Sequence, residues 1–295
     1  MIQLFNKISE DSSKSITNVY STSFSLGIKL FKPELRQPIY NIYGFVRIAD
    51  EIVDTFHDYD KHKLLQKFRN DTFEAIEMGI STNPVLNSFQ KTVNEFNIDL
   101  ELIDSFLKSM EMDLSISSHE QSSYDEYVNG SAEVVGLMCL KVFTQNNEQM
   151  YIAQKPYAEK LGSAFQKVNF LRDLKDDIEE RGRIYLPGVH KEQEINEFNK
   201  AIFEKEIEEE FHEAHIGIMK LPFGVRLGVY LAYIYYLTLF KKLKGKSVDE
   251  IKTMRVRVPN FVKIFLLVKS YFTIRILKRE FAEQSWNIIW LYHLY

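Results

Sequence analysis

A long helix with one polar face is predicted between Gly162 and Pro187, where the chain reads GSAFQKVNFLRDLKDDIEERGRIYLP. The polar residues recur at steps of four, three, four and four: Gly162, Gln166, Asn169, Asp173 and Asp177. Because an α-helix repeats every 3.6 residues, this spacing puts them on one face. Leu161, Phe165 and Val168 form a core-facing pattern on the other side, which leaves the polar stripe free to line a cavity.

The two aspartates of this stripe have two interpretations. An acidic helix face is most often simply solvated. Here a glycine and two amides precede the acids, and Arg172 stands beside Asp173, which favours a cavity. In a cavity two unpaired carboxylates repel each other and lose hydration, and a hard cation relieves both penalties. Mg²⁺ prefers one or two carboxylates together with substrate phosphates, so we expect Mg²⁺, or alternatively Mn²⁺, with a phosphate-bearing ligand.

A second acidic stripe follows a predicted break at residues 33–38. The segment 39–55, IYNIYGFVRIADEIVDT, is predicted to be helical. Steps of three, four, three and four place on one face Tyr40, Tyr43, Arg47, Asp50 and Asp54. An arginine one turn before an acid also occurs as a surface ion pair. The two tyrosines argue against full exposure, and two acidic stripes that face each other across a bundle would clamp a diphosphate through Mg²⁺.

Hydroxyl groups near the N-terminus suggest a further phosphate contact. Residues 15–31 include Ser21 and Ser23, and this cluster suits either a helix cap or the binding of phosphate oxygens. Ser9 or residues 11–13 are alternative candidates for a helix cap.

A basic turn follows the first acidic helix. Arg181 and Arg183 suit diphosphate oxygens, which guanidinium groups bind in a forked geometry. Upstream, residues 124–143 form a predicted helix in which Gly130 and Gly136 allow close helix packing or leave room for a ligand.

Residues 58–99 form a charged passage of helix and loop and are interpreted as scaffold. Residues 100–114 show the apolar spacing of a helix, and we assign Asp113 to the start of the polar loop that follows. His119 has no ligand-like neighbours and is assigned to the surface. Residues 221–243 are aromatic at helical steps, which indicates core and a section of cavity wall.

Composition indicates an all-α protein with a single domain over residues 1–295. Only 12 Gly and 7 Pro are spread over the chain, and no Ser-, Gly- or Pro-rich linker divides it. The 45% hydrophobic content, with 22 Phe and 16 Tyr, is sufficient for a packed core and a central apolar cavity. The net charge of −4 argues against nucleic acid as a partner. The sequence does not indicate an oligomeric state.

Several features bear on location. The lone Cys139 fits a reducing compartment, and the first residues lack the apolar region of a secretory signal, so we expect a cytoplasmic protein. The longest uncharged run, Leu227 to Phe240, is too short to span a membrane. Residues 255–279 are apolar and basic, which suits either peripheral contact with an anionic membrane or burial against the bundle. The last aromatic residues, about 280–295, are assigned no role.

These motifs resemble the squalene/phytoene synthase family of head-to-head prenyl transferases, and within it the bacterial type of phytoene synthase. Residues 43–54, YGFVRIADEIVD, resemble the first acidic motif of the family. Residues 166–187, with NFLRD and RGRIYLP, resemble the second. Residues 127–138 are similar to the tyrosine- and glycine-containing helix, and residues 255–259 to a late basic segment. Thr22 departs from the pattern, since many relatives have a lysine there, and Glu133 replaces a residue that is often small.

The resemblance implies an isoprenoid synthase bundle with a central apolar channel. It also implies roles for the residues that match the motifs of the family. Its Mg²⁺ ligands would be Asp50, Asp54, Asn169, Asp173 and Asp177. Its diphosphate contacts would be Tyr43, Arg47, Gln166, Asn169, Arg172, Arg183, Ser21 and Ser23. Its catalytic residues would be these four aspartates together with Tyr127 and Tyr233. The two tyrosines would lie near the reacting carbons.

The implied reaction joins two prenyl diphosphates through a cyclopropylcarbinyl diphosphate. We favour two geranylgeranyl diphosphates giving phytoene, a step of carotenoid biosynthesis. The alternatives are squalene or dehydrosqualene from farnesyl diphosphate, and a non-catalytic assembly factor with the same fold. A terpene cyclase or chain-elongating transferase fits less well, because RGRIYLP is foreign to both. No dinucleotide-binding fingerprint occurs, so NADPH is not expected.

Overall fold

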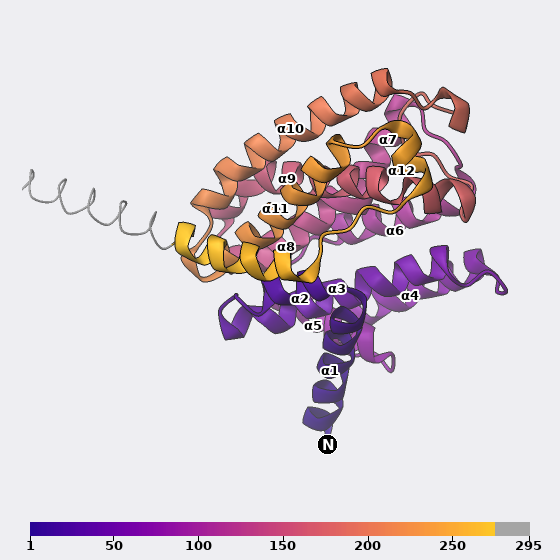
Figure 1. Ribbon diagram of the computed structural model, residues 1–295. Helices are drawn as coiled ribbons and strands as arrows, with labels where there is room; N and C mark the ends of the chain where they lie inside the picture. Colours follow the sequence, from indigo (N-terminus) through magenta and orange to yellow (C-terminus); the bar gives the residue numbers. More distant parts are fainter. Residues whose placement is uncertain (275–295) are drawn as a thin grey trace, which may run out of the picture.

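The computed structural model describes residues 1–274, which form helices joined by short connections (Figure 1). No strand occurs among the described residues, so the predicted all-α class is confirmed. The named elements are α1 (Ile2–Tyr20), α2 (Thr22–Ile28), α3 (Pro33–Asp54), α4 (Lys61–Met78), α5 (Pro84–Phe96), α6 (Leu100–Ser115), α7 (Gln121–Val128), the π-helical turn η1 (Asn129–Glu133), α8 (Val134–Thr144), α9 (Glu148–Glu179), the 3₁₀ turn η2 (Glu192–Glu194), α10 (Glu197–Lys220), α11 (Phe223–Lys244) and α12 (Val248–Thr253). Residues 260–274 add a further helix, called here the C-terminal helix.

Two groups of helices enclose the interior. Figure 1 shows α1 to α5 on one side of the molecule and α6 to α12 on the other. The 32-residue α9 is the central element, since it packs against η1, α8, α10, α11 and α12. The buried apolar side chains form one continuous cluster that includes residues of both groups. The prediction of one domain over residues 1–295 stays a prediction, because residues 275–295, including the unassigned tail, lie outside the described part.

The N-terminal hydroxyl residues occupy different positions from those predicted. Ser9 and Ser13 are not caps, because they lie inside α1, and both are buried. They bind α5 instead: the Ser13 and Ser88 hydroxyls lie 2.7 Å apart, and Asn87 donates to Ser9 at 3.1 Å. Ser21 is a cap, since its hydroxyl accepts the backbone N–H of Phe24 at the start of α2.

Helix α3 begins earlier than predicted. It starts at Pro33, whereas the sequence indicated a break up to Pro38 and a helix from Ile39. Proline is accepted at the first helical position, where its missing N–H would have no partner anyway. Pro38 lies inside the helix and is buried, so the only backbone donor lost there is the one that would reach Glu34. The acidic stripe therefore stands on a longer and more firmly packed helix than expected.

Two glycines bring α9 and α6 against the π-helical turn. A Cβ atom on Gly130 would lie 2.6 Å from the Ser105 carbonyl oxygen of α6. A Cβ atom on Gly162 would lie 2.6 Å from the Ala132 carbonyl oxygen. No side chain fits at such distances, so close packing accounts for both glycines.

Helix α11 is long and apolar enough to cross a membrane by length and composition alone, and it is the one such helix in residues 1–274. The sequence prediction considered only Leu227 to Phe240, whereas the helix spans Phe223–Lys244. In the fold it packs against α2, α9 and α10, and 44% of its most apolar window is buried. Burial in a helical bundle explains this composition as well as a membrane does.

Candidate active site

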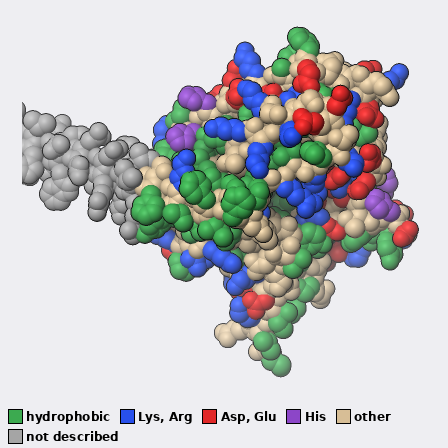
Figure 2. Space-filling view, in the orientation of Figure 1, with side chains coloured by type: hydrophobic (Ala, Val, Ile, Leu, Met, Phe, Trp, Pro, Cys, Tyr) green, Lys and Arg blue, Asp and Glu red, His purple; other side chains and the backbone are tan. Residues whose placement is uncertain are grey.

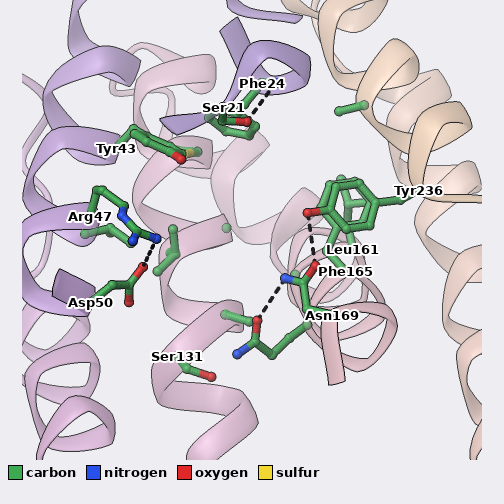
Figure 3. Close-up of a pocket in the computed structure, with 18 of the residues that line it drawn as sticks. Ser21, Phe24, Tyr43, Arg47, Asp50, Ser131, Leu161, Phe165, Asn169 and Tyr236 are labelled. Carbon is green, nitrogen blue, oxygen red and sulfur yellow. Dashed lines mark hydrogen bonds and ion pairs between the residues drawn. The ribbon is translucent and has the colours of Figure 1, made fainter. Parts of the chain in front are cut away.

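A cavity of about 670 Å³ lies between α2, α3, α8, α9 and α11. One end is polar and carries the aspartates and arginines of both acidic stripes, together with Arg255. The other end is apolar, with Phe31, Ile39, Phe143 and Leu221 among its lining residues. Figure 3 shows one wall, where Tyr43, Arg47 and Asp50 of α3 stand in a row, and the facing wall, where Leu161, Phe165 and Asn169 of α9 lie beside Tyr236.

The first acidic pair sits at the end of α3. Arg47 Nη1 lies 3.9 Å from Asp50 Oδ2, and Arg47 also forms an ion pair with Glu51. Arg47 is fixed further by the Tyr20 ring, whose centroid lies 4.3 Å from its guanidinium carbon. Burial raises the pKa of Asp50 to about 7, although Arg47 acts in the opposite direction, and the charges of Asp54 and Asp113 add to the rise.

The second acidic pair lies on α9. Asp173 accepts a hydrogen bond from Nε of its neighbour Arg172, at 2.8 Å. It also forms an ion pair with Arg255, whose Nη2 lies 2.8 Å from Oδ1 of Asp173. Asp177 is buried and pairs with Arg181 Nη1 at 3.1 Å. Burial raises the pKa of Asp177 to about 7, and repulsion from Asp173 adds to the rise.

The two pairs meet at the mouth of the cavity. Arg181 bridges them, because its Nη1 lies 3.1 Å from Asp177 and its Nε lies 3.6 Å from Asp54. The charge of Asp54 contributes to the raised pKa of both Asp50 and Asp177. The structure therefore brings together carboxylates that are separated by more than a hundred residues in the sequence. The pKa values of Asp50 and Asp177 are raised mainly by burial, and repulsion among these carboxylates adds to the rise.

Asp113 is a site residue that the sequence analysis missed. It was assigned to a loop, but it belongs to α6 and is buried. Its carboxylate accepts hydrogen bonds from the hydroxyls of Tyr127 at 2.9 Å and Tyr185 at 2.7 Å, and lies 3.6 Å from Arg183. Burial raises its pKa to about 6. Its register was the available signal, because Asp113 continues the buried stripe of α6 by one step of three after Met110.

Arg183 links this buried network to the acidic mouth. Its Nη1 donates to Asp54 at 2.8 Å and to the Tyr185 hydroxyl at 3.3 Å. Arg183 is buried, and it is not itself part of the cavity lining. It can therefore position Asp54 and share its charge, while Arg181, which lines the cavity, is better placed for direct contact with a ligand.

His119 is not a surface residue, so that assignment was wrong. It is 2% exposed, and its ring stacks on Tyr185 with centroids 5.7 Å apart and lies 5.2 Å from the Tyr127 ring. Burial lowers its pKa, which keeps the ring neutral and suited to packing behind the tyrosine pair.

The remaining predicted residues divide into those that reach the cavity and those that do not. Tyr43, Gln166, Asn169, Arg172, Tyr127 and Ser21 line it. Asn169 donates to Gln166 at 3.3 Å and accepts from the Tyr236 hydroxyl at 3.3 Å. Ser23 and Tyr233 are not among its lining residues, and Tyr233 packs against Phe211 instead. Tyr236, three residues further along α11, occupies the position expected of Tyr233.

The two departures from the family pattern have local partners. Thr22 accepts a hydrogen bond from Lys263 at 3.3 Å, so a lysine still reaches this point of the structure, although from the C-terminal helix. Glu133 accepts from Asn129 at 2.9 Å, and burial raises its pKa.

The donor set fits Mg²⁺ only in combination with a ligand. No three His, Cys, Asp or Glu side chains in residues 1–274 are close enough together to hold a metal ion by themselves. Mg²⁺ does not need such a cage, because it binds one or two carboxylates and completes its shell with water and phosphate oxygens. The two pairs offer hard oxygen donors at the edge of a cavity, and repulsion between neighbouring carboxylates contributes to the raised pKa values of Asp50 and Asp177, which a bound cation would relieve.

The fold and the site together define an all-helical protein with facing aspartate pairs at the mouth of an apolar cavity. The model of the squalene/phytoene synthase family matches residues 17–262. The chain therefore belongs to the squalene/phytoene synthase family.

Relatives and solved structures agree with this membership. The chain is 28% identical over 290 residues to a phytoene synthase of Arthrospira platensis, which covers 90% of this chain and 93% of the relative. It is 27% identical to phytoene synthase 1 of Solanum lycopersicum over 85% of this chain, but spans only 65% of that relative's length. It is 32% identical to a presqualene diphosphate synthase of Sinorhizobium fredii over 56% of this chain and 58% of the relative. A crystal structure of a dehydrosqualene synthase has the same fold, with a TM-score of 0.75 at 21% identity over 92% of this chain and 98% of that structure.

Proposed function

We propose that the protein joins two prenyl diphosphates head to head, and that its substrates are two molecules of geranylgeranyl diphosphate, which give phytoene. The observation that carries the proposal is the meeting of the Asp50/Asp54 and Asp173/Asp177 pairs at the mouth of an apolar cavity. The choice of phytoene is supported by the relative of similar length, a phytoene synthase that the chain matches over 90% of its residues.

The polar end of the cavity would hold the diphosphates. Mg²⁺ bound to the aspartates would neutralise the diphosphate charge and so assist its departure. The same end is lined by Arg47, Arg172 and Arg181. Their guanidinium groups can donate forked hydrogen bonds to the departing diphosphate. The side-chain Nε atoms of Arg47 and Arg181 are buried and have no hydrogen-bond partner in the protein. A phosphate oxygen would satisfy them.

The apolar part would protect the carbocation. When the C–O bond to the first diphosphate breaks, the allylic cation is left in a space shielded from water. Aromatic faces stabilise such a cation, and the stacked Phe165 and Tyr236, with centroids 4.0 Å apart, line the wall together with Tyr43 and Phe24. The double bond of the second substrate then attacks, and loss of one proton closes the cyclopropane ring.

The second half of the reaction releases the other diphosphate. The cyclopropylcarbinyl diphosphate ionises, the carbon skeleton rearranges, and a second proton leaves to give the linear product without a reductant. Tyr127 lines the cavity, and its hydroxyl donates to Asp113, so this pair offers a fixed polar group close to the reacting carbons. Tyr185 donates to the same carboxylate and lines the cavity beside it.

Product analysis tests this proposal. The purified protein is incubated with Mg²⁺ and either the C15 or the C20 diphosphate, and the hydrocarbon is identified by mass spectrometry. We expect phytoene from the C20 substrate. Dehydrosqualene from the C15 substrate, or squalene when NADPH is also added, would support the C15 alternative, which agrees with the similarity to a presqualene diphosphate synthase. Unchanged diphosphate in both reactions would favour a non-catalytic assembly factor.

A further inference from the structure

Acidic residues are absent from three segments that lie against one another. Residues 12–33, 214–248 and 251–274 contain no Asp or Glu, but 14 Lys and Arg. The whole chain has 41 Asp and Glu and a net charge of −4, so the rest of the protein is strongly acidic. These segments contain α2, α11 and the C-terminal helix. A basic face on an acidic protein indicates an anionic partner.

The three segments are in contact in the fold. The backbone N–H of Lys32, just after α2, donates to the Gly224 carbonyl oxygen of α11 at 2.9 Å. Lys263 of the C-terminal helix reaches Thr22 at 3.3 Å and lies 5.4 Å from the centroid of the Tyr235 ring of α11. The three segments therefore adjoin one another, although some of their basic residues already have acidic partners: Lys244 pairs with Glu208, Lys246 with Glu250, and Arg255 with Asp173 and Asp176.

The C-terminal helix presents a second apolar face, which no described residue covers. Leu266, Ser270 and Ile274 are buried and bind the helix to the bundle. The opposite stripe recurs at steps of three, one, three and four residues, and its exposed fractions run from 49% to 74%: Phe261, Ile264, Phe265, Val268 and Phe272. A solvated helix face normally carries polar residues, so this stripe needs a partner.

Figure 2 shows the apolar stripe as a cluster of hydrophobic side chains at the front of the molecule, with Lys and Arg side chains above and below it. Arg257 precedes the stripe, and Lys269 lies beside it and is exposed. Apolar side chains bordered by basic ones match a bilayer surface, where acyl chains lie beneath anionic headgroups. A nucleic acid would match the basic residues but leave the exposed apolar stripe without a partner.

The same segments form part of the cavity wall. Phe24 and Gly27 of α2 and Val229 and Tyr236 of α11 line the cavity with their inner faces. Arg255, at the start of the last segment, pairs with Asp173 of the polar end at 2.8 Å. A membrane on the outer side would lie next to the apolar part of the cavity.

We propose that the apolar stripe of the C-terminal helix, residues 261–272, docks on an anionic bilayer surface, with the exposed basic residues Arg257 and Lys269 of the last segment, and Lys29 just after α2, binding the headgroups. This docking would hold the apolar cavity beside the phase into which a long hydrocarbon partitions. The docking does not depend on which prenyl diphosphate is the substrate.

Vesicle flotation tests the proposal with the full chain. Vesicles of neutral phosphatidylcholine are compared with vesicles that contain about one third phosphatidylglycerol. We expect the protein to float with the anionic vesicles, and to lose binding as salt is raised, because surface attraction is screened within a Debye length. Each basic residue near the surface contributes about fivefold in binding, so Lys269→Glu should weaken it by more than that factor.

Two matched variants distinguish binding through the apolar stripe from nonspecific binding through any exposed hydrophobic side chain. Phe261→Ser with Phe265→Ser removes two exposed side chains of the stripe, and we expect binding to fall about tenfold or more. Phe198→Ser removes a side chain that is 75% exposed on the acidic α10, and should leave binding unchanged. Neither variant touches the cavity, so the activity in detergent should equal that of the unchanged protein.

Three results would overturn the proposal. The first is no flotation of the full chain with either vesicle. The second is equal flotation of the Phe261/Phe265 variant and the unchanged protein. The third is a dimer in sedimentation that the Phe261/Phe265 variant abolishes, because the stripe would then bind a second copy. Absence of both flotation and dimer would point instead to residues 275–295 of the same chain as the occupant.

Discussion

Helix α9 carries two clusters of charged residues. In one the opposite charges come from the protein itself, and in the other the charged residues line a cavity. Between α9 and α10, Lys167 is 3% exposed and lies 2.7 Å from Glu206 and 2.8 Å from Glu210. Ser163 also donates to Glu210, at 2.8 Å. At the cavity, Asp173 and Asp177 lie beside open space and face a second acidic pair.

This difference indicates that the first cluster contributes to stability and the second to ligand binding. Lys167 has both of its carboxylate partners within the protein, and the cluster does not line the cavity, so it serves the packing of α9 against α10, although Oε2 of Glu210 has no hydrogen-bond partner. The aspartate pairs line the cavity, where burial and neighbouring carboxylates raise the pKa of Asp50 and Asp177 to about 7. A site that must bind a charged ligand has to leave charge unsatisfied in the free protein. The following predictions test this contrast.

The largest effect is expected from the aspartates of the cavity. Asp50→Asn or Asp173→Asn should lower turnover about a thousandfold or more, because each change removes charge that holds the diphosphate in the transition state. The melting temperature should stay the same or rise, since a repulsive carboxylate is lost. Turnover is measured by release of diphosphate. Glu179→Gln, an exposed change on the same helix, is the control and should leave turnover unchanged.

The opposite pattern is expected for the outer cluster. Lys167→Met should lower the free energy of unfolding by about 3 kcal/mol, because it leaves the buried Glu210 with only Lys160, at 3.7 Å, as a cation partner. The fraction that remains folded should keep normal turnover. Urea unfolding measures the loss, and Lys205→Met, at an exposed position of α10, serves as the control. A large loss of turnover per folded molecule would contradict the separation of the two clusters.

Asp113 should show an intermediate effect. Asp113→Asn keeps the shape but removes the charge that fixes Arg183 and accepts from two tyrosine hydroxyls. We expect kcat to fall about tenfold to a hundredfold, with a smaller change in KM, because Asp113 acts mainly by holding Arg183 and the two tyrosine hydroxyls in place. Steady-state kinetics measures both values. An equal loss for Asp113→Ala and Asp113→Asn is expected if the charge matters, whereas full activity of Asp113→Asn would contradict the role.

The smallest effect concerns pH. The pKa values of Asp50, Asp113 and Asp177 are raised by burial to about 7, 6 and 7 from an ordinary value of 3.8. Between about pH 4 and pH 7 the folded protein therefore binds more protons than the unfolded chain, and its stability falls as pH rises through this range. In EDTA the melting temperature should be higher at pH 5.5 than at pH 8. Mg²⁺ with inorganic diphosphate should restore it at pH 8, and a rise from pH 5.5 to pH 8 in EDTA would contradict this account.

Helical periodicity was sufficient to predict the two acidic stripes and the all-α class. Spacing places Asp173 and Asp177 on one face whatever the rest of the fold, so these residues could be identified from the sequence. Spacing also places Asp113 on the buried stripe of α6, but its role could not be identified in this way, because its partners Tyr127, Tyr185 and Arg183 come from other elements.

The face of α11 that lines the cavity differs from the predicted one. Tyr233 and Tyr236 are both aromatic residues of α11 and differ by one step of three. Only tertiary packing decides that Tyr236 faces Asn169 while Tyr233 packs against Phe211. His119 is likewise buried because the ring of Tyr185, distant in sequence, packs on it together with the ring of the nearby Tyr127.

The central claim is that the aspartates of α3 and α9 form one diphosphate site. Anomalous scattering from Mn²⁺ in crystals grown with a thio analogue of geranylgeranyl diphosphate, which resists ionisation, tests it most directly. We predict Mn²⁺ between the Asp50/Asp54 and Asp173/Asp177 pairs, in contact with the diphosphate oxygens and with the prenyl chain in the apolar cavity. Mn²⁺ at only one pair, or a diphosphate bound away from both, would contradict the account.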